Sequence, residues 1–270
     1  MKLVLATICV AILSFHANAQ KTWNYNFNDL RPAVFIASAD AKSFLTPVAD
    51  GGGTFTAYLT GEAGDGAIEI ITPGLAGGTG AELKLTAGAK GVAKLGLSGI
   101  SDATTAMAVK FNARFEGKSG RLTFALGDDK GNFSGNTSVP VKQGFAVLNF
   151  NYSYANKNIE LKNLHDSKWE LVEAMPALDV NKNYVFEIYA NNSAEGLKYT
   201  RGKVHKLAKN SYDLWVNGEL VLTKEVTTNL PAGKNLNALM LSGFSSANNT
   251  VKLYVDDLVY TNALPTKDLK

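Results

Sequence analysis

The stretch "MAVKFNARF" (residues 107–115) has the clearest structural pattern in this sequence. Apolar side chains hold every odd position from Met107 to Phe115, whereas Lys110, Asn112 and Arg114 hold even positions. A repeat of two residues is that of a β-strand with one buried side and one solvent-facing side. The stretch therefore predicts a half-buried strand.

The same alternation recurs along the chain, between turns rich in glycine or polar residues. "RLTFAL" (121–126) follows a "GKSG" turn and is predicted to be the hairpin partner of 107–115. Asn217-Gly218 separates two alternating runs, and Asn-Gly tolerates the positive φ angles of a type I′ hairpin turn. Further alternating runs lie at 145–154, 169–174, 184–190, 236–244 and 251–260. Many short strands without a long amphipathic helix predict an all-β sandwich of two sheets.

The first residues, "MKLVLATICVAILSFHANAQ" (1–20), have the form of a secretory signal peptide. Lys2 precedes an apolar run, and Ala17-Asn18-Ala19 provides a small-x-small cleavage motif. We expect cleavage between Ala19 and Gln20, so that 1–19 are the signal peptide and 20–270 form one domain. The apolar run is shorter than the about 20 residues that span a bilayer. The mature protein is therefore predicted to be secreted or periplasmic, with no membrane span.

Cysteine usage and charge exclude several classes of function. Cys9 is the one cysteine, so the mature chain has no disulfide, no thiolate nucleophile and no Cys-ligated zinc. An exported chain without cysteine also favours a bacterial source. Without Lys2, 26 basic and 24 acidic side chains remain. A balance this even predicts neither a nucleic-acid partner nor an anionic membrane surface.

Several stretches are similar to a known group of proteins. The residues "YVFEIYANNSAEGLKYTRG" (184–202), "YDLWVNGELV" (212–221), "LNALMLSGFSS" (236–246) and "VKLYVDDLVYTN" (251–262) resemble the C-terminal half of secreted bacterial jelly rolls in the concanavalin A-like, laminin-G-like group. "VKFNARFEGKSGRLTFALGDDKGNFS" (109–134) looks like the middle strands of these modules. The resemblance implies a two-sheet antiparallel jelly-roll sandwich that binds its ligand on a concave sheet face. The group includes lectin-like modules, polysaccharide lyases and glycoside hydrolases. The Glu-x-Asp-x-x-Glu strand of its retaining glucanases does not occur here.

The stretch "YTRGKVH" (199–205) suggests a site. If it is a strand, Tyr199, Arg201, Lys203 and His205 project from one face, about 6.6 Å apart. A lyase of the jelly-roll type needs a base, for which Tyr199 or His205 is suitable, and a donor such as Arg201 to neutralise the carboxylate of a uronate. The Gln-x-His strand of alginate-type lyases is absent. The same face could instead bind glycan without cleavage, or serve only solubility.

The neighbouring run "SYDLWVN" (211–217) places Asp213, Trp215 and Asn217 on one face. Trp215 offers a flat apolar platform for a sugar ring, and Asp213 could hydrogen-bond a pair of hydroxyls. The alternative is that a loop or the second sheet covers Trp215, since large aromatic side chains in sandwiches are commonly packed.

The last predicted strand contains Asp257 in phase with the apolar residues Val251, Leu253 and Val255. An unpaired buried carboxylate would cost several kcal/mol. Three solutions are open: a β-bulge that turns the side chain outward, a partner such as a backbone amide or Arg31, or a bound cation. By resemblance to jelly-roll modules, a structural calcium could join Asp257 to Asn28 or Asp29, with further oxygen ligands from carbonyls or water.

The sequence thus predicts an exported protein that binds a polysaccharide or other glycan through Tyr199, Arg201, His205, Asp213 and Trp215, without cleaving it. The first alternative is a polysaccharide lyase that acts on uronate-containing glycans. The second alternative is a structural or adhesive surface module with no glycan site. The predicted cofactor is none, or calcium in a structural role at Asp29 and Asp257.

Overall fold

The computed structural model describes residues 20–36, 45–60, 65–77, 80–135, 142–153, 158–175, 177–227, 229–245 and 251–269. The predicted signal peptide, residues 1–19, lies outside these ranges. The described part of the chain holds strands, turns and loops, and no helix in it is long and apolar enough to cross a membrane.

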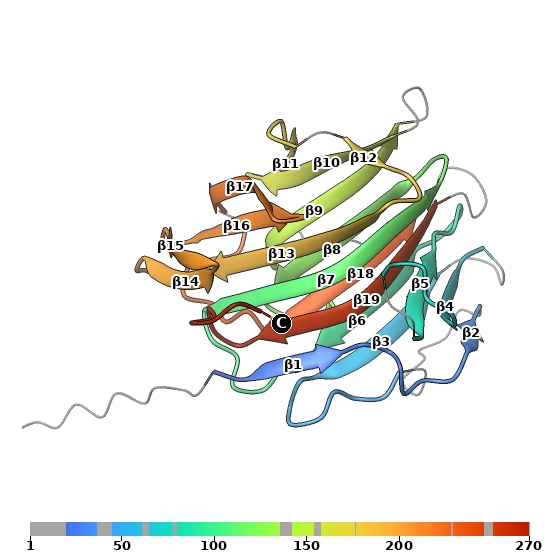
Figure 1. Ribbon diagram of the computed structural model, residues 1–270, viewed down its shortest axis with the longest axis horizontal. Helices are drawn as coiled ribbons and strands as arrows, with labels where there is room; N and C mark the ends of the chain where they lie inside the picture. The colour runs from blue at the N-terminus through green and yellow to red at the C-terminus, as the bar shows by residue number, and fades with distance from the viewer. Residues whose placement is uncertain are drawn as a thin grey trace, which may run out of the picture.

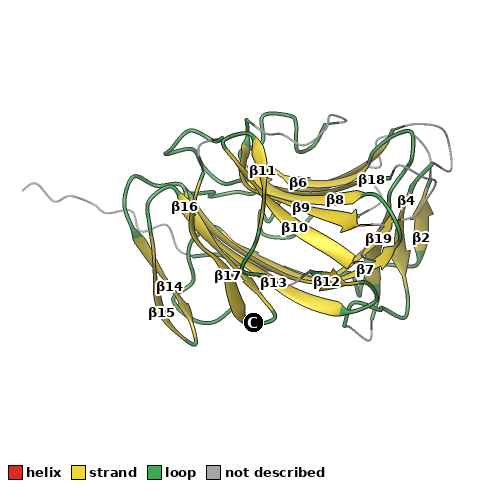
Figure 2. Cartoon of the chain, turned by 90° about the horizontal axis from the view of Figure 1, so that it is seen from above, coloured by secondary structure: helices red, strands yellow, loops and turns green. Residues whose placement is uncertain are grey.

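Two large antiparallel sheets lie face to face and account for most of the described residues (Figures 1 and 2). We call the nine-stranded one the front sheet. Its order is β17 (Glu219–Val226), β16 (Ser211–Val216), β13 (Asn183–Asn191), β7 (Ala106–Gly117), β19 (Val251–Thr261), β5 (Glu82–Thr86), β4 (Ala67–Ile71) and β2 (Ala33–Phe35), and β1 (Thr22–Tyr25) also pairs with β19.

The eight-stranded sheet is called the back sheet. Its order is β11 (Lys168–Leu171), β10 (Asn158–His165), β9 (Gly144–Ser153), β8 (Arg121–Gly127), β18 (Ala238–Phe244), β6 (Ala93–Ser98) and β3 (Thr54–Leu59), and β12 (Leu178–Asp179) pairs with β10. A separate hairpin consists of β14 (Leu197–Arg201) and β15 (Lys203–Leu207). This architecture confirms the predicted all-β, two-sheet antiparallel sandwich.

Aromatic side chains from facing strands fill the space between the sheets. Phe111 of β7 stacks on Phe124 of β8 across the core, with ring centroids 5.3 Å apart, and on Phe186 of β13 at the same distance. The predicted hairpin between 107–115 and 121–126 is therefore wrong. The "GKSG" turn carries the chain from one sheet to the other, and β8 pairs with β9 and β18 instead. Alternation reveals a buried face, but it does not say which strand supplies the hydrogen-bond partners.

The Asn217-Gly218 turn is confirmed as a tight hairpin. β16 and β17 pair antiparallel on either side of it, and the two φ angles are 48° and 87°. Both values are positive, as a type I′ turn requires.

A β-bulge in β19 explains how the structure accommodates Asp257 within the apolar phase of this strand. Asp256 lies opposite Asn112 of β7 and Val259 lies opposite Lys110, so that two residues of β19 face one residue of β7. Asp257 has a φ of 49° at this point. Val255, two residues before Asp257, and Leu258, directly after it, both pack in the core. Asp257 leaves the buried phase, as the first of the three solutions predicted.

The stretch 199–205 is not one strand. Gly202, with a φ of 63°, turns the chain between β14 and β15. Tyr199 pairs with His205 and Arg201 with Lys203, so the four side chains do not form a single row. The period-two pattern continues through the turn because a two-stranded hairpin places cross-strand partners on the same face.

Candidate functional site

The candidate site is a groove on the outer face of the front sheet, turned away from the back sheet. The register of the strands places its residues side by side, because cross-strand partners align their side chains in rows on one face of the sheet. Asn24 of β1 is opposite Val259 of β19, Val259 is opposite Lys110 of β7, and Lys110 is opposite Glu187 of β13. These four residues form one row across four strands.

The groove has a volume of about 640 Å³, and seven of its ten lining residues have polar side chains. Its walls come from four neighbouring strands, the turn after β16 and the tip of the β14–β15 hairpin, which stands off one end of the front sheet (Figure 2). The lining residues are Asn24, Lys110, Asn112, Val185, Glu187, Arg201, Asn217, Gly218, Asp257 and Val259.

Arg201 and Glu187 form the most extensive polar contact in the groove. The Nε of Arg201 lies 3.1 Å from each oxygen of Glu187, and Nη2 donates to Oε1 at 2.8 Å. Tyr189 donates its hydroxyl to Glu187 Oε2 at 2.9 Å. The hydrogen bonds to Glu187 raise the pKa of Arg201 above its usual value. Both side chains are therefore held in place before any ligand arrives, and Nη1 of Arg201 keeps protons for another acceptor.

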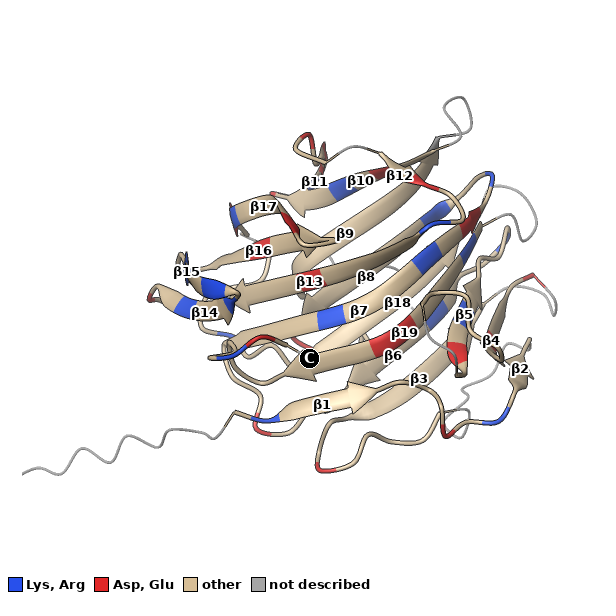
Figure 3. Ribbon diagram, in the orientation of Figure 1, with Lys and Arg blue, Asp and Glu red and all other residues tan. Residues whose placement is uncertain are grey.

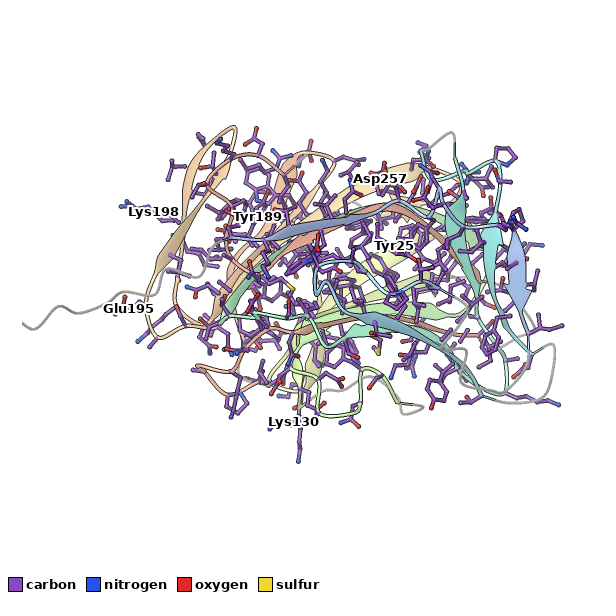
Figure 4. All side chains as sticks on the ribbon, turned by 90° about the horizontal axis from the view of Figure 1, so that it is seen from below. Tyr25, Lys130, Tyr189, Glu195, Lys198 and Asp257 are labelled. Carbon is purple, nitrogen blue, oxygen red and sulfur yellow. The ribbon has the colours of Figure 1, made fainter. Side chains whose placement is uncertain are left out.

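Two asparagines are oriented in a similar way. Asn112 Nδ2 donates to Asp257 Oδ2 at 2.9 Å, which leaves the Asn112 carbonyl oxygen as an acceptor. Asn217 Oδ1 accepts from the Val185 amide at 2.8 Å, which leaves the Asn217 NH2 group as a donor. Asp257 is in reach of Asn112 because the bulge turns it to this face. In Figure 4 Asp257 lies on the outer side of the front sheet, whereas Tyr25 lies between the sheets.

The charges of the groove balance. Lys110 and Arg201 are basic, Glu187 and Asp257 are acidic, and Lys110 also donates to the carbonyl of Leu269 at 3.2 Å. Figure 3 shows basic and acidic positions interspersed over β7, β13 and β19 rather than gathered by sign. The groove therefore has no net charge with which to collect polyanions.

Three of the predicted contact residues lie together but are buried. Tyr199 is 0% exposed, Asp213 2% and Trp215 9%. The Tyr199 hydroxyl donates to Asp213 Oδ2 at 2.7 Å and accepts from Trp215 Nε1 at 2.9 Å. Tyr199 also stacks on Tyr189 with 3.9 Å between ring centroids. They form a small second core between the hairpin and the front sheet, so the packing alternative proposed for Trp215 describes them.

The three groups predicted for a lyase are engaged in contacts within the protein. Burial raises the pKa of Tyr199, and its hydrogen bond to Asp213 raises it further, which opposes a role as base. His205 stacks on Tyr199 at 5.0 Å, and its Nε2 lies 3.3 Å from the carbonyl oxygen of Arg201. Arg201, the predicted carboxylate clamp, is occupied by Glu187. Of the five predicted contact residues, Arg201 is the one that lines the groove.

The predicted calcium pair, Asp29 and Asp257, does not stand out as a cation site among the described contacts. Asp29 is exposed, Asp257 accepts from Asn112, and Asn28 uses its side-chain oxygen for the Ala81 amide at 2.9 Å. Within the described ranges, one group of three His, Asp or Glu side chains is close enough to share an ion, and neither aspartate belongs to it. Calcium needs six to eight oxygens, so a site at these two carboxylates would also need carbonyl or water oxygens, and it stays a prediction.

Sequence reasoning missed most of the groove. Lys110, Asn112 and Glu187 were assigned only to predicted strands, and Asn24 was not assigned. A signal was present, because Lys110 and Asn112 hold the polar phase of the most regular strand in the chain. That phase predicts a solvent-facing surface, but a groove depends on which strands lie beside it.

Comparisons with known proteins identify no family. No family model and no curated protein matches the sequence. Among solved structures, the calreticulin globular domain of T. cruzi is 9% identical, with a TM-score of 0.49, over 90% of this chain and 89% of that chain. Domain 4 of AbnA, an extracellular arabinanase from Geobacillus stearothermophilus solved with arabinotriose, is 13% identical, with a TM-score of 0.48, over 92% and 95%. Likenesses this weak carry no argument about function.

Proposed function

We propose that this protein is exported and binds a neutral glycan in the groove of the front sheet, without cleaving it. The observation that carries the proposal is the set of oriented polar side chains along the groove, above all the Arg201–Glu187 and Asn112–Asp257 pairs. Fixed donors and acceptors on an open, concave surface are what a sugar with many hydroxyls requires.

Sugar hydroxyls both donate and accept hydrogen bonds, so a site for them needs groups of both kinds. The groove supplies acceptors at Asn112 and Asp257, and donors at Asn217, Lys110 and Arg201. Because partners in the protein already hold several of these groups, little side-chain entropy remains to be lost on binding. Asn24 is exposed at the end of the row and extends the polar surface beyond Lys110.

A neutral glycan suits the charge balance better than a uronate polymer. Each basic group of the groove is matched by an acidic one, so an incoming carboxylate would meet Glu187 and Asp257 as well as Arg201 and Lys110. Like-charge contacts of this kind discriminate against the wrong ligand.

We infer that the protein does not cleave the glycan from the hydrogen bonds that the Glu187 and Asp257 carboxylates accept. Glycoside hydrolysis needs one carboxyl group that carries a proton and a second that is ionised. Both oxygens of Glu187 accept hydrogen bonds, from Arg201 and Tyr189, which leaves no room for a proton to be donated to substrate. Asp257 Oδ2 is likewise an acceptor from Asn112.

The test is affinity electrophoresis of the mature chain through gels that contain neutral or uronate polysaccharides. We expect retardation in at least one neutral gel, with no release of reducing ends or unsaturated products from that polysaccharide. Retardation only in uronate gels would reject the neutral-glycan assignment. Unchanged migration across a broad panel would reject glycan binding and favour a structural surface module.

A further inference from the structure

A cluster of imidazole and carboxylate groups lies where the edges of the two sheets meet, away from the groove. β17 is the edge strand of the front sheet, and β10 and β11 lie at the edge of the back sheet (Figure 1). Glu225 of β17 is the cross-strand partner of Tyr212, whose side chain packs in the core. Cross-strand partners share a face, so Glu225 points inward, toward the back sheet.

The groups that meet Glu225 come from β10 and β11. His165 Nδ1 lies 2.9 Å from Glu225 Oε1. One side-chain atom each of His165, Glu170 and Glu225 lies within 4.8 Å of the other two. Asp166 is adjacent, with Oδ2 3.5 Å from His165 Nε2. Three carboxylates thus surround one imidazole, and this excess of negative charge favours a cation.

The Glu225 carboxylate is held in position by its neighbours. Asn163 Nδ2 donates to Glu225 Oε1 at 2.9 Å. Beside them lies Tyr212, a residue that is 1% exposed, whose buried hydroxyl has no hydrogen-bond partner among the described residues. Burial raises the pKa of this hydroxyl, and the charge of Glu225 raises it further. Hydrogen bonds from neighbouring polar groups commonly orient the carboxylates of metal sites.

We propose that His165, Glu170 and Glu225 bind a divalent transition-metal cation of the zinc class, which ties the edge of the back sheet to the edge of the front sheet. A water molecule completes the coordination. The metal site shares no residue with the groove, and it does not depend on whether the groove binds a glycan.

The ligand types select the metal. Zinc accepts imidazole nitrogen and carboxylate oxygen at about 2.0–2.2 Å, so the ligand atoms must close around it by movement of side chains. Glu170 is exposed and free to swing inward. Calcium takes six to eight oxygens, which one imidazole and a few carboxylates do not provide. We therefore expect zinc to bind at this site and calcium not to bind.

The test uses the mature chain without a polyhistidine tag, freed of metal by a chelator and then dialysed. Calorimetric titration with Zn²⁺ should show one saturable site. At a hundredfold excess over Kd, zinc should raise the melting temperature by roughly 5–10 °C, whereas calcium should not. Substituting Co²⁺ should give a visible absorption band, which reports coordination independently of stability.

Two variants and two matched controls locate the site. Glu170→Gln changes an exposed side chain and is expected to fold normally, and it should weaken zinc binding at least tenfold. His165→Gln should abolish it. The matched controls, Glu195→Gln and His205→Gln, remove the same groups elsewhere on the molecule and should bind zinc like the unmodified chain. The proposal would be overturned if zinc did not bind one-to-one, or if Glu170→Gln and His165→Gln bound zinc as tightly as the unmodified chain. It would also be overturned if calcium stabilised the protein as much as zinc does.

Discussion

The guanidinium of Arg201 lies over the ring of Trp215, 4.4 Å from its centroid, and it simultaneously pairs with Glu187. A cation over an indole ring is a favourable contact. The same contact covers the flat surface that a sugar ring would need. This relationship assigns Trp215 to packing, so the proposed glycan recognition would depend on the polar edge of Arg201 and its neighbours in the groove.

Substitution of the buried tyrosine should affect stability. Tyr199→Phe removes the acceptor of Trp215 Nε1 and the donor to Asp213, and both are left buried without this partner. We expect a loss of about 1–3 kcal/mol in the free energy of unfolding, measured by urea denaturation. Tyr58→Phe, a half-buried position on β3, should change stability by less than about 0.5 kcal/mol. A fully stable Tyr199→Phe would contradict the packing role.

The bulge should make residue 257 sensitive to backbone preference. Asp257 has a positive φ, which asparagine tolerates and a β-branched residue does not. Asp257→Val should destabilise the protein by about 1–3 kcal/mol, whereas Asp257→Asn should lose much less. Thermal and urea unfolding of the two variants would measure the difference. Equal stability would mean that the bulge does not constrain this position.

The neighbouring aspartate should make stability depend on pH. Burial raises the pKa of Asp256 to about 6, and the charges of Asp257 and Glu82 add to the effect. The folded state thus binds a proton more tightly than the unfolded state. Protonated Asp256 therefore makes its full contribution to the free energy of unfolding below about pH 4, and this contribution is lost as the pH rises toward about 6.

Asp256→Asn tests this linkage, because asparagine can still accept from the Asp257 amide. We expect the variant to be more stable than the unmodified chain at pH 7, by about 1–3 kcal/mol. Its free energy of unfolding should also lose the slope against pH that the unmodified chain shows between pH 4 and pH 6. Asp29→Asn, at an exposed position, is the control and should leave the slope unchanged. An unchanged slope in Asp256→Asn would assign the pH dependence to other groups.

Groove substitutions should weaken glycan binding without unfolding the protein. Asn112→Ala removes one oriented acceptor, and Asn24→Ala removes an exposed amide at the end of the row. A hydrogen bond worth about 1 kcal/mol corresponds to about fivefold in Kd, so each variant should show reduced retardation in the gel that retards the parent. Asn235→Ala, exposed outside the groove, should migrate like the parent. Equal retardation of all three variants would place binding elsewhere.

The stability of these variants has to be measured alongside binding. Asn24 is exposed, so its loss should leave the unfolding curve within about 0.5 kcal/mol of the parent. Asn112 also holds Asp257, and some destabilisation is expected there. A binding defect in Asn24→Ala with an unchanged unfolding curve would therefore be the cleaner support for the groove.

Sequence reasoning was most accurate where the signal is local. Alternation at 107–115 and the Asn217-Gly218 turn both describe the structure, because side-chain direction along a strand and the φ angles of a turn depend on a few adjacent residues. The same reasoning failed at 121–126, which joins the other sheet, and at 199–205, where Gly202 turns the chain. Both errors concern partners and direction, which neighbouring residues do not specify.

The candidate site shows the same division. Tyr199, Asp213 and Trp215 were named as candidate contacts from two neighbouring stretches, and their side chains meet in the structure. Their burial follows from the hairpin folding back on Tyr189, a contact that no local pattern predicts. The row from Asn24 to Glu187 joins residues more than 160 positions apart along the chain, and it exists only through strand register.

By itself, the sequence determined the all-β class, the positions of several strands such as β7, β13 and β19, the polar phase of β7 and the need for an exceptional solution at Asp257. Each of these follows from the two-residue repeat of a strand and the cost of burying a carboxylate. Tertiary structure decided that the solution is a bulge, that Arg201 covers Trp215, and that His165 meets Glu225 across the sheet edges. Those outcomes depend on contacts between residues distant in the chain, whose formation is governed by packing of the whole sandwich.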